Sequence, residues 1–338
     1  MPRVRASCIA LVALALSACG DQRAPSWELT GSTMGTTFSV VLVAPSGSAV
    51  PASVETRIHE ALDEVDRLAS TWRADSELTA FNTAKSTDWL PVSAAFCGML
   101  EQALDVARET GGAFDVTVGP LVNLWGFGPG RIVEEPPADD LLEAARQLVG
   151  FEGISTDCAL PAARKRDADM YVDLSGWAKG YAVDQVAQLL ADDGFADFMV
   201  EIGGELRVGG HNAEGRNWAI AVEAPATDRR VAQRVVRVSD TSVATSGDYR
   251  NYFEFEGRMY SHTIDPRTGR PVAHRLASVT VVDDSAARAD ALATALLVLG
   301  PEEGPALAES LGVAAYFLVR DTDAIREKTT TGFDRLRE

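Results

Sequence analysis

The chain has 338 residues, 46% of them hydrophobic, and its 31 Lys and Arg against 49 Asp and Glu give a formal net charge of −18. This length and composition exclude disorder for most of the chain and allow either one large domain or two. The negative field would repel phosphate backbones and anionic lipids, and no basic stripe interrupts it. We therefore expect no nucleic-acid partner.

The N-terminal segment has the features of a signal peptide. Arg3 and Arg5 precede an apolar run over residues 6–16, which is too short to span a bilayer and is followed by small residues. The run ends in Leu16-Ser17-Ala18-Cys19-Gly20, which resembles the lipobox of bacterial lipoprotein precursors. That resemblance implies that Cys19 becomes the lipidated first residue of the mature protein. A general signal peptide that contains a Cys is the alternative.

The domain organisation follows from this segment. We expect a lipoprotein signal peptide over residues 1–18, a lipidated Cys with a polar tether over residues 19–26, and one folded domain over residues 27–338. Neither a fixed repeat nor a long low-complexity linker divides the rest of the chain. Cleavage would remove Cys8 and lipidation would use Cys19, which leaves Cys97 and Cys158. An oxidising compartment makes a disulfide between them possible, although their spacing does not imply one.

Hydrophobic periodicity and glycine stops predict five helices in the body of the chain. They cover residues 54–68, 96–107, 141–149, 180–194 and 286–299. Strand patterns are expected over residues 36–43, 170–174, 198–208, 218–223, 235–238, 252–255, 259–264, 277–282 and 314–319. Glu256-Gly257 is a hairpin signal between two of these strands. Because helices and strands do not alternate regularly, we expect an α+β fold with mainly antiparallel sheets.

Three polar segments are candidates for chemistry, while the common zinc, P-loop and nucleophile-elbow motifs are absent from the sequence. Residues 172–181 pass from a strand through small residues into a helix, where backbone amides could face an anion. A strand-to-helix turn capped by Ser175 is the alternative. The glycines at 126, 128 and 130 lack a full dinucleotide fingerprint and are interpreted as a loop.

Asp290 and Thr294 form the second candidate. They are four residues apart on a predicted helix, so they share one face and could bind one ion. A carboxylate and a hydroxyl, with no Cys or His nearby, suit Mg²⁺. An Asp favoured by the helix dipole and a Thr bonded back to a carbonyl are the alternative.

His262 is the third candidate, at a strand end that enters a turn containing Asp265-Pro266 and Thr268-Gly269. A histidine beside carboxylates can act as a general base near neutral pH. A structural histidine is equally consistent with this segment alone.

Taken together, these motifs resemble the ApbE family, the FAD:protein FMN transferases. The resemblance runs in chain order over nearly the whole mature sequence. The matching segments are residues 31–36, 70–78, 111–128, 173–180, 201–205, 261–269 and 289–297. It implies a T-fold-like arrangement of the α+β class and a Mg²⁺-dependent enzyme. Such an enzyme moves FMN from FAD to a Thr or Ser hydroxyl of an acceptor protein through a phosphoester and releases AMP.

The resemblance also implies roles for individual residues. His262 matches the base. The metal ligands match Asp290, Thr294 and the backbone carbonyl of Ala178. The FAD contacts match Met34, Trp72, Ala113, Phe114, Asp115, Lys179 and Ile264. The acceptors expected from the family are subunits of membrane redox complexes, the sodium-pumping NADH:quinone oxidoreductase (Nqr) and the related Rnf complex. We expect the protein in the bacterial cell envelope, lipid-anchored to the inner membrane and facing the periplasm, with the anchor as its only membrane contact.

Two other functions remain open from the sequence. An FAD pyrophosphatase would use the same motifs, with water replacing the acceptor hydroxyl, and would yield free FMN and AMP. A non-catalytic FAD-binding lipoprotein would not need Asp290, Thr294 or His262, all of which are present.

Overall fold

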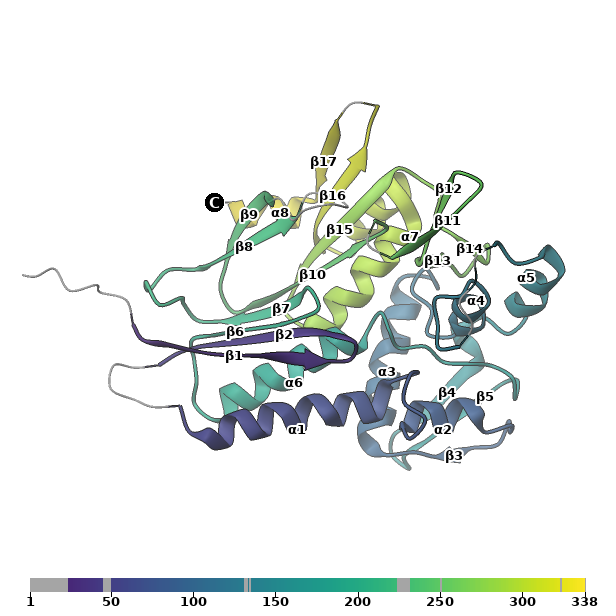
Figure 1. Cartoon of the computed structure of the whole chain (residues 1–338), viewed down its shortest axis with the longest axis horizontal. Helices are drawn as coiled ribbons and strands as arrows, with labels where there is room; N and C mark the ends of the chain where they lie inside the picture. Colours follow the sequence, from purple (N-terminus) through teal and green to yellow (C-terminus); the bar gives the residue numbers. More distant parts are fainter. Residues whose placement is uncertain are drawn as a thin grey trace, which may run out of the picture.

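An antiparallel eight-stranded sheet forms the centre of the part of the chain that the structure describes (Figure 1). The computed structural model describes residues 24–44, 50–130, 133, 135–223, 232–249, 251–322 and 324–337, so the expected signal peptide and Cys19 lie outside the described residues. In sheet order the strands are β1 (Ser26–Thr33), β2 (Thr36–Val43), β6 (Phe198–Ile202), β7 (Glu205–Gly209), β10 (Thr241–Gly247), β15 (Leu276–Asp283), β16 (Ala314–Arg320) and β17 (Ile325–Thr329).

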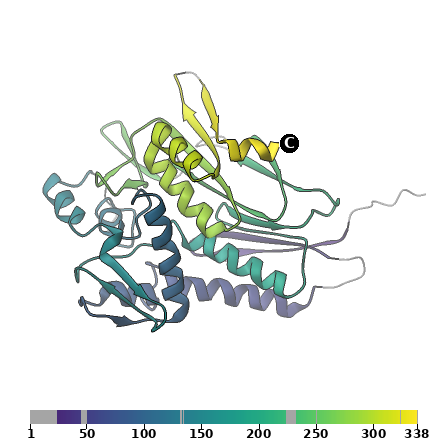
Figure 2. The same ribbon diagram turned by 180° about the vertical axis from the view of Figure 1, so that it is seen from behind.

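Alternate side chains of the sheet supply two cores, one on each face. On β2, Val40 and Leu42 join the larger core, and on β16 Tyr316 and Leu318 join the smaller one, because successive strand residues point to opposite faces. Helices cover the larger core (Figure 2): α1 (Ala52–Ala69), α3 (Ala94–Glu109), α6 (Ala178–Asp192) and α7 (Ala286–Ser310). The hairpin of β8 (Trp218–Glu223) and β9 (Ala232–Val238), together with α8 (Thr331–Asp334), covers the smaller core.

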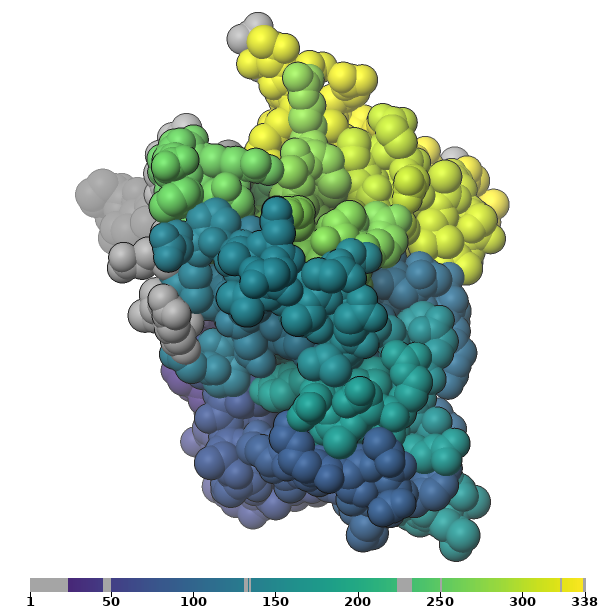
Figure 3. All heavy atoms as spheres, turned by 90° about the vertical axis from the view of Figure 1, so that its right-hand side faces the viewer, coloured from purple at the N-terminus to yellow at the C-terminus, as the bar shows by residue number. Residues whose placement is uncertain are grey.

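A smaller lobe packs beside the helical layer and carries several loops of the site. Its elements are α2 (Glu77–Thr83), α4 (Gly119–Leu124), α5 (Asp139–Arg146) and a three-stranded sheet of β3 (Leu90–Pro91), β5 (Ala162–Lys165) and β4 (Ile154–Asp157). The hairpin of β11 (Tyr252–Phe255) and β12 (Arg258–Ser261) contacts this lobe, since Tyr260 stacks on Trp125. Figure 3 shows the green hairpin against the teal segment of α4 and α5. The short strands β13 (Ile264–Asp265) and β14 (Arg270–Pro271) follow it.

The α+β class and all five predicted helices are confirmed, with one difference in the last helix. Gly300, at which that helix was predicted to end, has a φ of 81°, and the helical path resumes at Pro301 and continues to Ser310. The Glu256-Gly257 turn is also confirmed, because both residues have positive φ, as a tight hairpin requires. No helix within the described part of the chain has both the length and the apolarity of a transmembrane span.

Three strand predictions were wrong in physically distinct ways. Residues 170–174 join no sheet, because the Asn82 side chain takes the place of a strand partner and bonds both the N–H (2.7 Å) and the C=O (2.8 Å) of Val172. Residues 198–208 form a hairpin instead of one strand, turning at Gly203-Gly204, where φ is positive. The strand predicted over 259–264 stops at Ser261.

Other strands escaped prediction because their sequences carry little hydrophobic signal. They are β1, β3, β4, β5, β10, β14 and β17. β1 alternates exposed and half-buried residues as an edge strand of the sheet. The Ala24 N–H donates to the Ala213 carbonyl at 2.8 Å, so residues 24–26, expected in the tether, belong to the folded body.

Helices α6 and α7 cross so closely that only glycine fits at position 180. A Cβ there would collide with the backbone of Ala286 and Ala287. This crossing fixes α7, which carries Asp290 and Thr294, against the start of α6.

We predict that Gly180→Ala lowers the free energy of unfolding by at least about 2 kcal/mol, because the added methyl overpacks a rigid backbone contact. Gly98→Ala is the matched control, since Gly98 also lies within a helix but a Cβ there meets nothing within 4 Å. It should stabilise by about 0.5–1 kcal/mol through helix propensity. Urea denaturation measures both, and equal effects would contradict the close crossing.

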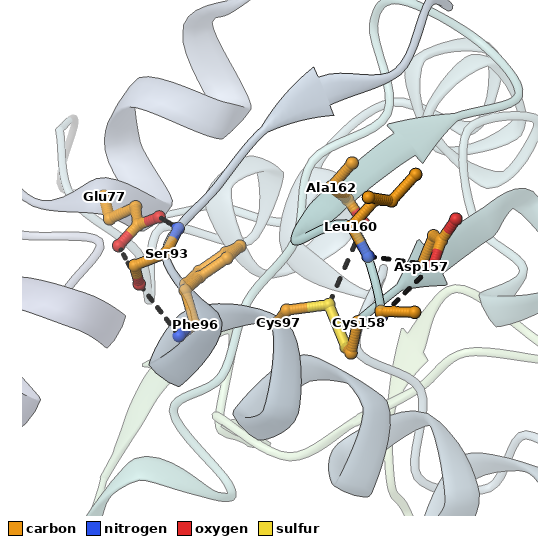
Figure 4. Close-up of a disulfide and its surroundings, with 9 residues drawn as sticks. Glu77, Ser93, Phe96, Cys97, Asp157, Cys158, Leu160 and Ala162 are labelled. Carbon is orange, nitrogen blue, oxygen red and sulfur yellow. Dashed lines mark hydrogen bonds between the residues drawn. A yellow bond between two sulfur atoms is a disulfide. The ribbon is translucent and has the colours of Figure 1, made fainter.

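A disulfide joins Cys97 of α3 to Cys158 in the β4–β5 turn (Figure 4). The two cysteines are 61 residues apart, and the intervening chain includes residues 113–128. The disulfide that the sequence left open is therefore formed, and it closes the loop of chain that contains much of the lobe.

Replacing both Cys97 and Cys158 by Ser should lower the free energy of unfolding by about 2–4 kcal/mol, because a long closed loop no longer restricts the unfolded chain. A reducing agent should destabilise the wild-type protein by a similar amount and leave the double variant unchanged. Identical denaturation curves for wild type with and without reductant would contradict this prediction.

Candidate functional site

One cavity of about 560 Å³ opens where the sheet, α7 and the lobe meet. We call it the main cavity. Residues from distant parts of the sequence line it, among them 71–72, 113–115, 173, 175–176, 179, 201, 203–206, 245–247, 249, 251, 262–264, 266 and the α7 positions 290, 294 and 298. The cavity therefore gathers most of the motifs that the sequence analysis identified one by one.

Asp115 organises the loop that brings Ala113 and Phe114 to the cavity. Its carboxylate accepts from the Thr117 N–H at 2.7 Å, the Thr117 hydroxyl at 2.6 Å and the Phe151 N–H at 3.0 Å. Burial raises the pKa of Asp115, opposed by these hydrogen bonds. Although Asp115 lines the cavity, its carboxylate oxygens are already hydrogen-bonded to Thr117 and Phe151 and stabilise the loop.

Asp184 of α6 fixes the start of α7. Its carboxylate accepts from the Ala286 and Ala287 N–H groups at 3.0 and 3.1 Å and from the Ser285 hydroxyl at 2.7 Å. Arg207 of β7 pairs with the same carboxylate at 2.7 Å. A negative group at a helix N-terminus satisfies its free amides and is favoured by the dipole. Asp290 follows within the second turn of this anchored helix.

The half-buried Lys179 and the buried carboxylates of Asp290 and Glu205 form a charged cluster in the cavity lining. The Lys179 Nζ lies 3.3 Å from Asp290 Oδ2 and 3.7 Å from Glu205 Oε2. Burial acts to lower the pKa of Lys179, but the two carboxylates outweigh it and raise the pKa overall. Burial raises the pKa of Glu205, and the Asp290 charge adds to that effect. The single ammonium of Lys179 is thus the partner of two buried carboxylates.

The oxygens around this cluster could hold a hard divalent cation. Thr294 lies one turn after Asp290, and its hydroxyl is 3.1 Å from that of Ser246. Glu205 Oε2 is buried without a hydrogen-bond partner, a costly state that a nearby cation would relieve. The described residues hold no group of three or more His, Cys, Asp or Glu arranged for a metal. Mg²⁺ commonly uses one or two carboxylates and takes its other ligands from water and phosphate.

His262 stands at the base of the β11–β12 hairpin, and its ring is held in one tautomer. Its Nδ1 lies 3.0 Å from the Asn251 carbonyl, which can only accept, so Nδ1 carries the proton and Nε2 keeps a lone pair. Burial lowers the pKa of His262, partly opposed by this hydrogen bond. The imidazole is therefore neutral near pH 7 and can accept a proton through Nε2.

An apolar wall forms another side of the cavity. Phe114, Phe127 and Ile264 line it, and Trp72 lies at the surface with 68% of its area exposed. An exposed tryptophan beside a cavity offers a flat face to an aromatic ligand.

The structure brings most of the predicted site residues together. Those that line the cavity are Trp72, Ala113, Phe114, Asp115, Lys179, His262, Ile264, Asp290 and Thr294. Met34 and Ala178 are not among the lining residues. Met34 occupies the β1–β2 turn with a φ of 46°, and Ala178 is the first residue of α6. The roles assigned to all these residues from the family remain predictions.

Several lining or supporting residues were not identified from the sequence. Glu205 lies within the segment 201–205 that carries the family resemblance, and an acid beside two glycines was the available signal. Ser246 and Asn251 carried no signal, since a serine in a strand and an asparagine beside a hairpin are common. Ser175 was expected as a possible helix cap, but the N-cap of α6 is Trp177, without a side-chain hydrogen bond.

Comparison with known proteins identifies the family. The model of the ApbE family matches residues 34–317. A curated FAD:protein FMN transferase from Vibrio cholerae is 43% identical over 325 residues, which cover 96% of this chain and 97% of the relative. A solved flavin transferase ApbE from Vibrio cholerae has a TM-score of 0.85 at 42% identity, covering 92% of this chain and 99% of that chain.

A second solved structure agrees. The flavinyl transferase ApbE of Pseudomonas stutzeri, in its apo form, has a TM-score of 0.85 at 40% identity and covers 93% of this chain and 97% of that chain. Because the family model spans most of the sequence and the relatives align over nearly their whole length, this chain belongs to the ApbE family.

Proposed function

We propose that this protein is an FAD:protein FMN transferase. The observation that carries the proposal is the convergence, in one cavity, of a neutral histidine, a carboxylate and hydroxyl able to hold a cation, and an aromatic wall. In the reaction, an acceptor Thr or Ser hydroxyl attacks the phosphorus on the FMN side of FAD. The bond from that phosphorus to the AMP oxygen breaks, and AMP leaves. Relatives that carry this name support the proposal.

His262 takes the proton of the attacking hydroxyl. Its Nε2 is free to accept because Nδ1 is bonded to Asn251, and its lowered pKa keeps it unprotonated at neutral pH. General bases of this kind typically contribute about 10²–10⁴-fold to the rate. Phe127 contacts the imidazole edge to face, with ring centroids 6.3 Å apart, and restricts its orientation.

Asp290 and Thr294, with the Ala178 carbonyl, are the residues that would hold Mg²⁺. The residues fit the ion because they are hard oxygen donors beside a buried carboxylate with an unsatisfied oxygen. When bound, Mg²⁺ neutralises charge on phosphate oxygens during phosphoryl transfer. Lys179 adds a fixed positive charge, and Trp72 and Phe114 offer apolar surface to the flavin ring.

The proposal extends to the place of the protein in the cell. We assign a lipid anchor at Cys19 in the bacterial inner membrane, with the body facing the periplasm. The N-terminal sequence and the Cys97–Cys158 disulfide support this assignment, since disulfides persist in oxidising compartments. The acceptors would then be periplasm-facing subunits of membrane redox complexes of the Nqr and Rnf type.

The direct test mixes the purified protein with FAD, Mg²⁺ and a candidate acceptor domain and follows the intact mass of the acceptor. An added FMN phosphate ester, with one AMP released for each adduct, supports transfer. AMP and free FMN without an adduct on any Thr- or Ser-containing acceptor would contradict it and indicate hydrolysis.

His262→Ala should slow FMN transfer by about 10²–10⁴-fold while leaving FAD affinity within a few-fold, because the imidazole acts on the proton and not on the bound dinucleotide. The wild-type rate should be full at pH 7 and fall as pH drops through a pKa below about 6.5, because protonated His262 cannot accept. His211→Ala, which alters an exposed histidine outside the cavity lining, is the control. An unchanged rate in His262→Ala would remove His262 from the mechanism.

Asp290→Ala should abolish stimulation by Mg²⁺, because it removes the carboxylate among the proposed ligands. Thr294→Ser keeps a hydroxyl at the other position and should retain most of the stimulation. Transfer rates measured against Mg²⁺ concentration check both variants. An Asp290→Ala protein that Mg²⁺ still activates like wild type would place the metal elsewhere.

A further inference from the structure

The Lys179 ammonium is shared unequally between two buried carboxylates. Its Nζ lies 3.3 Å from Asp290 Oδ2 and 3.3 Å from the Ser175 carbonyl, but 3.7 Å from Glu205 Oε2. Both carboxylates are almost fully buried, at 4% and 5% side-chain exposure. Asp290 Oδ2 also receives the Gly180 N–H at 3.4 Å. Lys179 is therefore within hydrogen-bond range of Asp290 and outside it for Glu205.

Glu205 has an oxygen that lacks a hydrogen bond. Its Oε2 is buried without a hydrogen-bond partner, although buried carboxylate oxygens are normally satisfied. The nearest cationic group to this oxygen, among the described ion pairs, is the Lys179 ammonium. Glu205 thus presents an open acceptor position that a small movement of that ammonium would fill.

The backbone beside Lys179 confines its alkyl chain, while the ammonium can still shift between the carboxylates of Asp290 and Glu205. Gly203, with a φ of 63°, turns β6 into β7 directly before Glu205. A Cβ at Gly203 would lie 3.2 Å from Lys179 Cδ and 2.9 Å from Thr36 Cγ2. The turn is therefore packed against the lysine stem, and the same turn carries Glu205 to the ammonium.

We propose that Glu205 is a positioning residue that takes over the Lys179 ammonium when a divalent cation engages Asp290. The inference rests on the proposed function, because Asp290 is a metal ligand only there. A cation at Asp290 repels the ammonium that shares its carboxylate. With Glu205 as the alternative partner, Lys179 closes its gap to Oε2 and stays in the cavity as a positive charge for the substrate phosphates. Without Glu205, metal and lysine compete for one carboxylate.

Isothermal titration of Mg²⁺ into the full chain without FAD tests this exchange. Glu205→Gln should weaken Mg²⁺ binding, and Lys179→Met should strengthen it. The fold-loss of Mg²⁺ affinity caused by Glu205→Gln should be at least about five times smaller in the Lys179→Met background than in wild type, because the competing ammonium is gone. Equal fold-changes in both backgrounds would overturn the inference and show that Glu205 acts through its field or as a ligand.

Glu205→Asp distinguishes the contact with Lys179 from the negative charge of Glu205. It also provides the test if the Glu205→Gln protein does not fold. It keeps the negative charge but retracts it from Lys179, so it should weaken Mg²⁺ binding in the wild-type background and not in Lys179→Met. Glu201→Gln removes a charge from the same cavity lining, where Glu201 accepts from the Gly204 N–H at 2.7 Å. Its effect on Mg²⁺ binding should be the same in both backgrounds. An effect of Glu205→Asp that persists without Lys179 would contradict the exchange.

Failure of the proposed metal site would look different. If Asp290→Ala binds Mg²⁺ as tightly as wild type, or wild type binds none, the metal assignment falls and the exchange with it. If Asp290→Ala loses Mg²⁺ binding while the Glu205 effects are independent of Lys179, the metal site stands and only the role of Glu205 is overturned.

Discussion

The excess of carboxylates over cations in the lining of the main cavity is the constraint on which the rest of the site depends. Among the described residues that line it, the acids are Asp115, Asp173, Glu201, Glu205, Glu223 and Asp290, and Lys179 is the only Lys or Arg. A dinucleotide pyrophosphate brings further negative charge, which a low-dielectric site opposes strongly. We propose that such a substrate is accommodated only if positive charge enters with it. The overall acidity of the chain is thus repeated at the site itself.

The fold serves this constraint by fixing the elements that carry the charged groups. The glycine crossing at position 180 and the Asp184 carboxylate lock the start of α7 onto α6, so Asp290 and Lys179 meet across two rigid helices. The hairpin that ends at His262 is held against the lobe by its stacked aromatic rings, with Phe253 and Tyr260 centroids 5.1 Å apart. Under the proposed function, binding and proton transfer would therefore have separate supports, one in the helical layer and one in the lobe.

Much of the fold and site could be predicted from the sequence where one signal dominated. Long amphipathic helices such as α1 and α3 were evident from periodicity, and the motifs identified nine residues that line the cavity. The errors arose where tertiary contacts replaced local pattern. Asn82 substitutes for a strand partner of Val172, and nothing near either residue in sequence indicates that contact. The pairing of Lys179 with Glu205 likewise depends on packing of α6 against a distant turn.

FAD affinity with and without divalent cation tests the central claim most directly. Titration of FAD into the wild-type protein should give much tighter binding with Mg²⁺ than with a chelator, because the cation offsets the carboxylates of the cavity. In Asp290→Asn, which lacks one of those charges and a proposed ligand, the difference between the two conditions should largely disappear. Equally tight FAD binding by wild type in Mg²⁺ and in chelator would contradict the claim that the acidic cavity admits its substrate only with an accompanying cation.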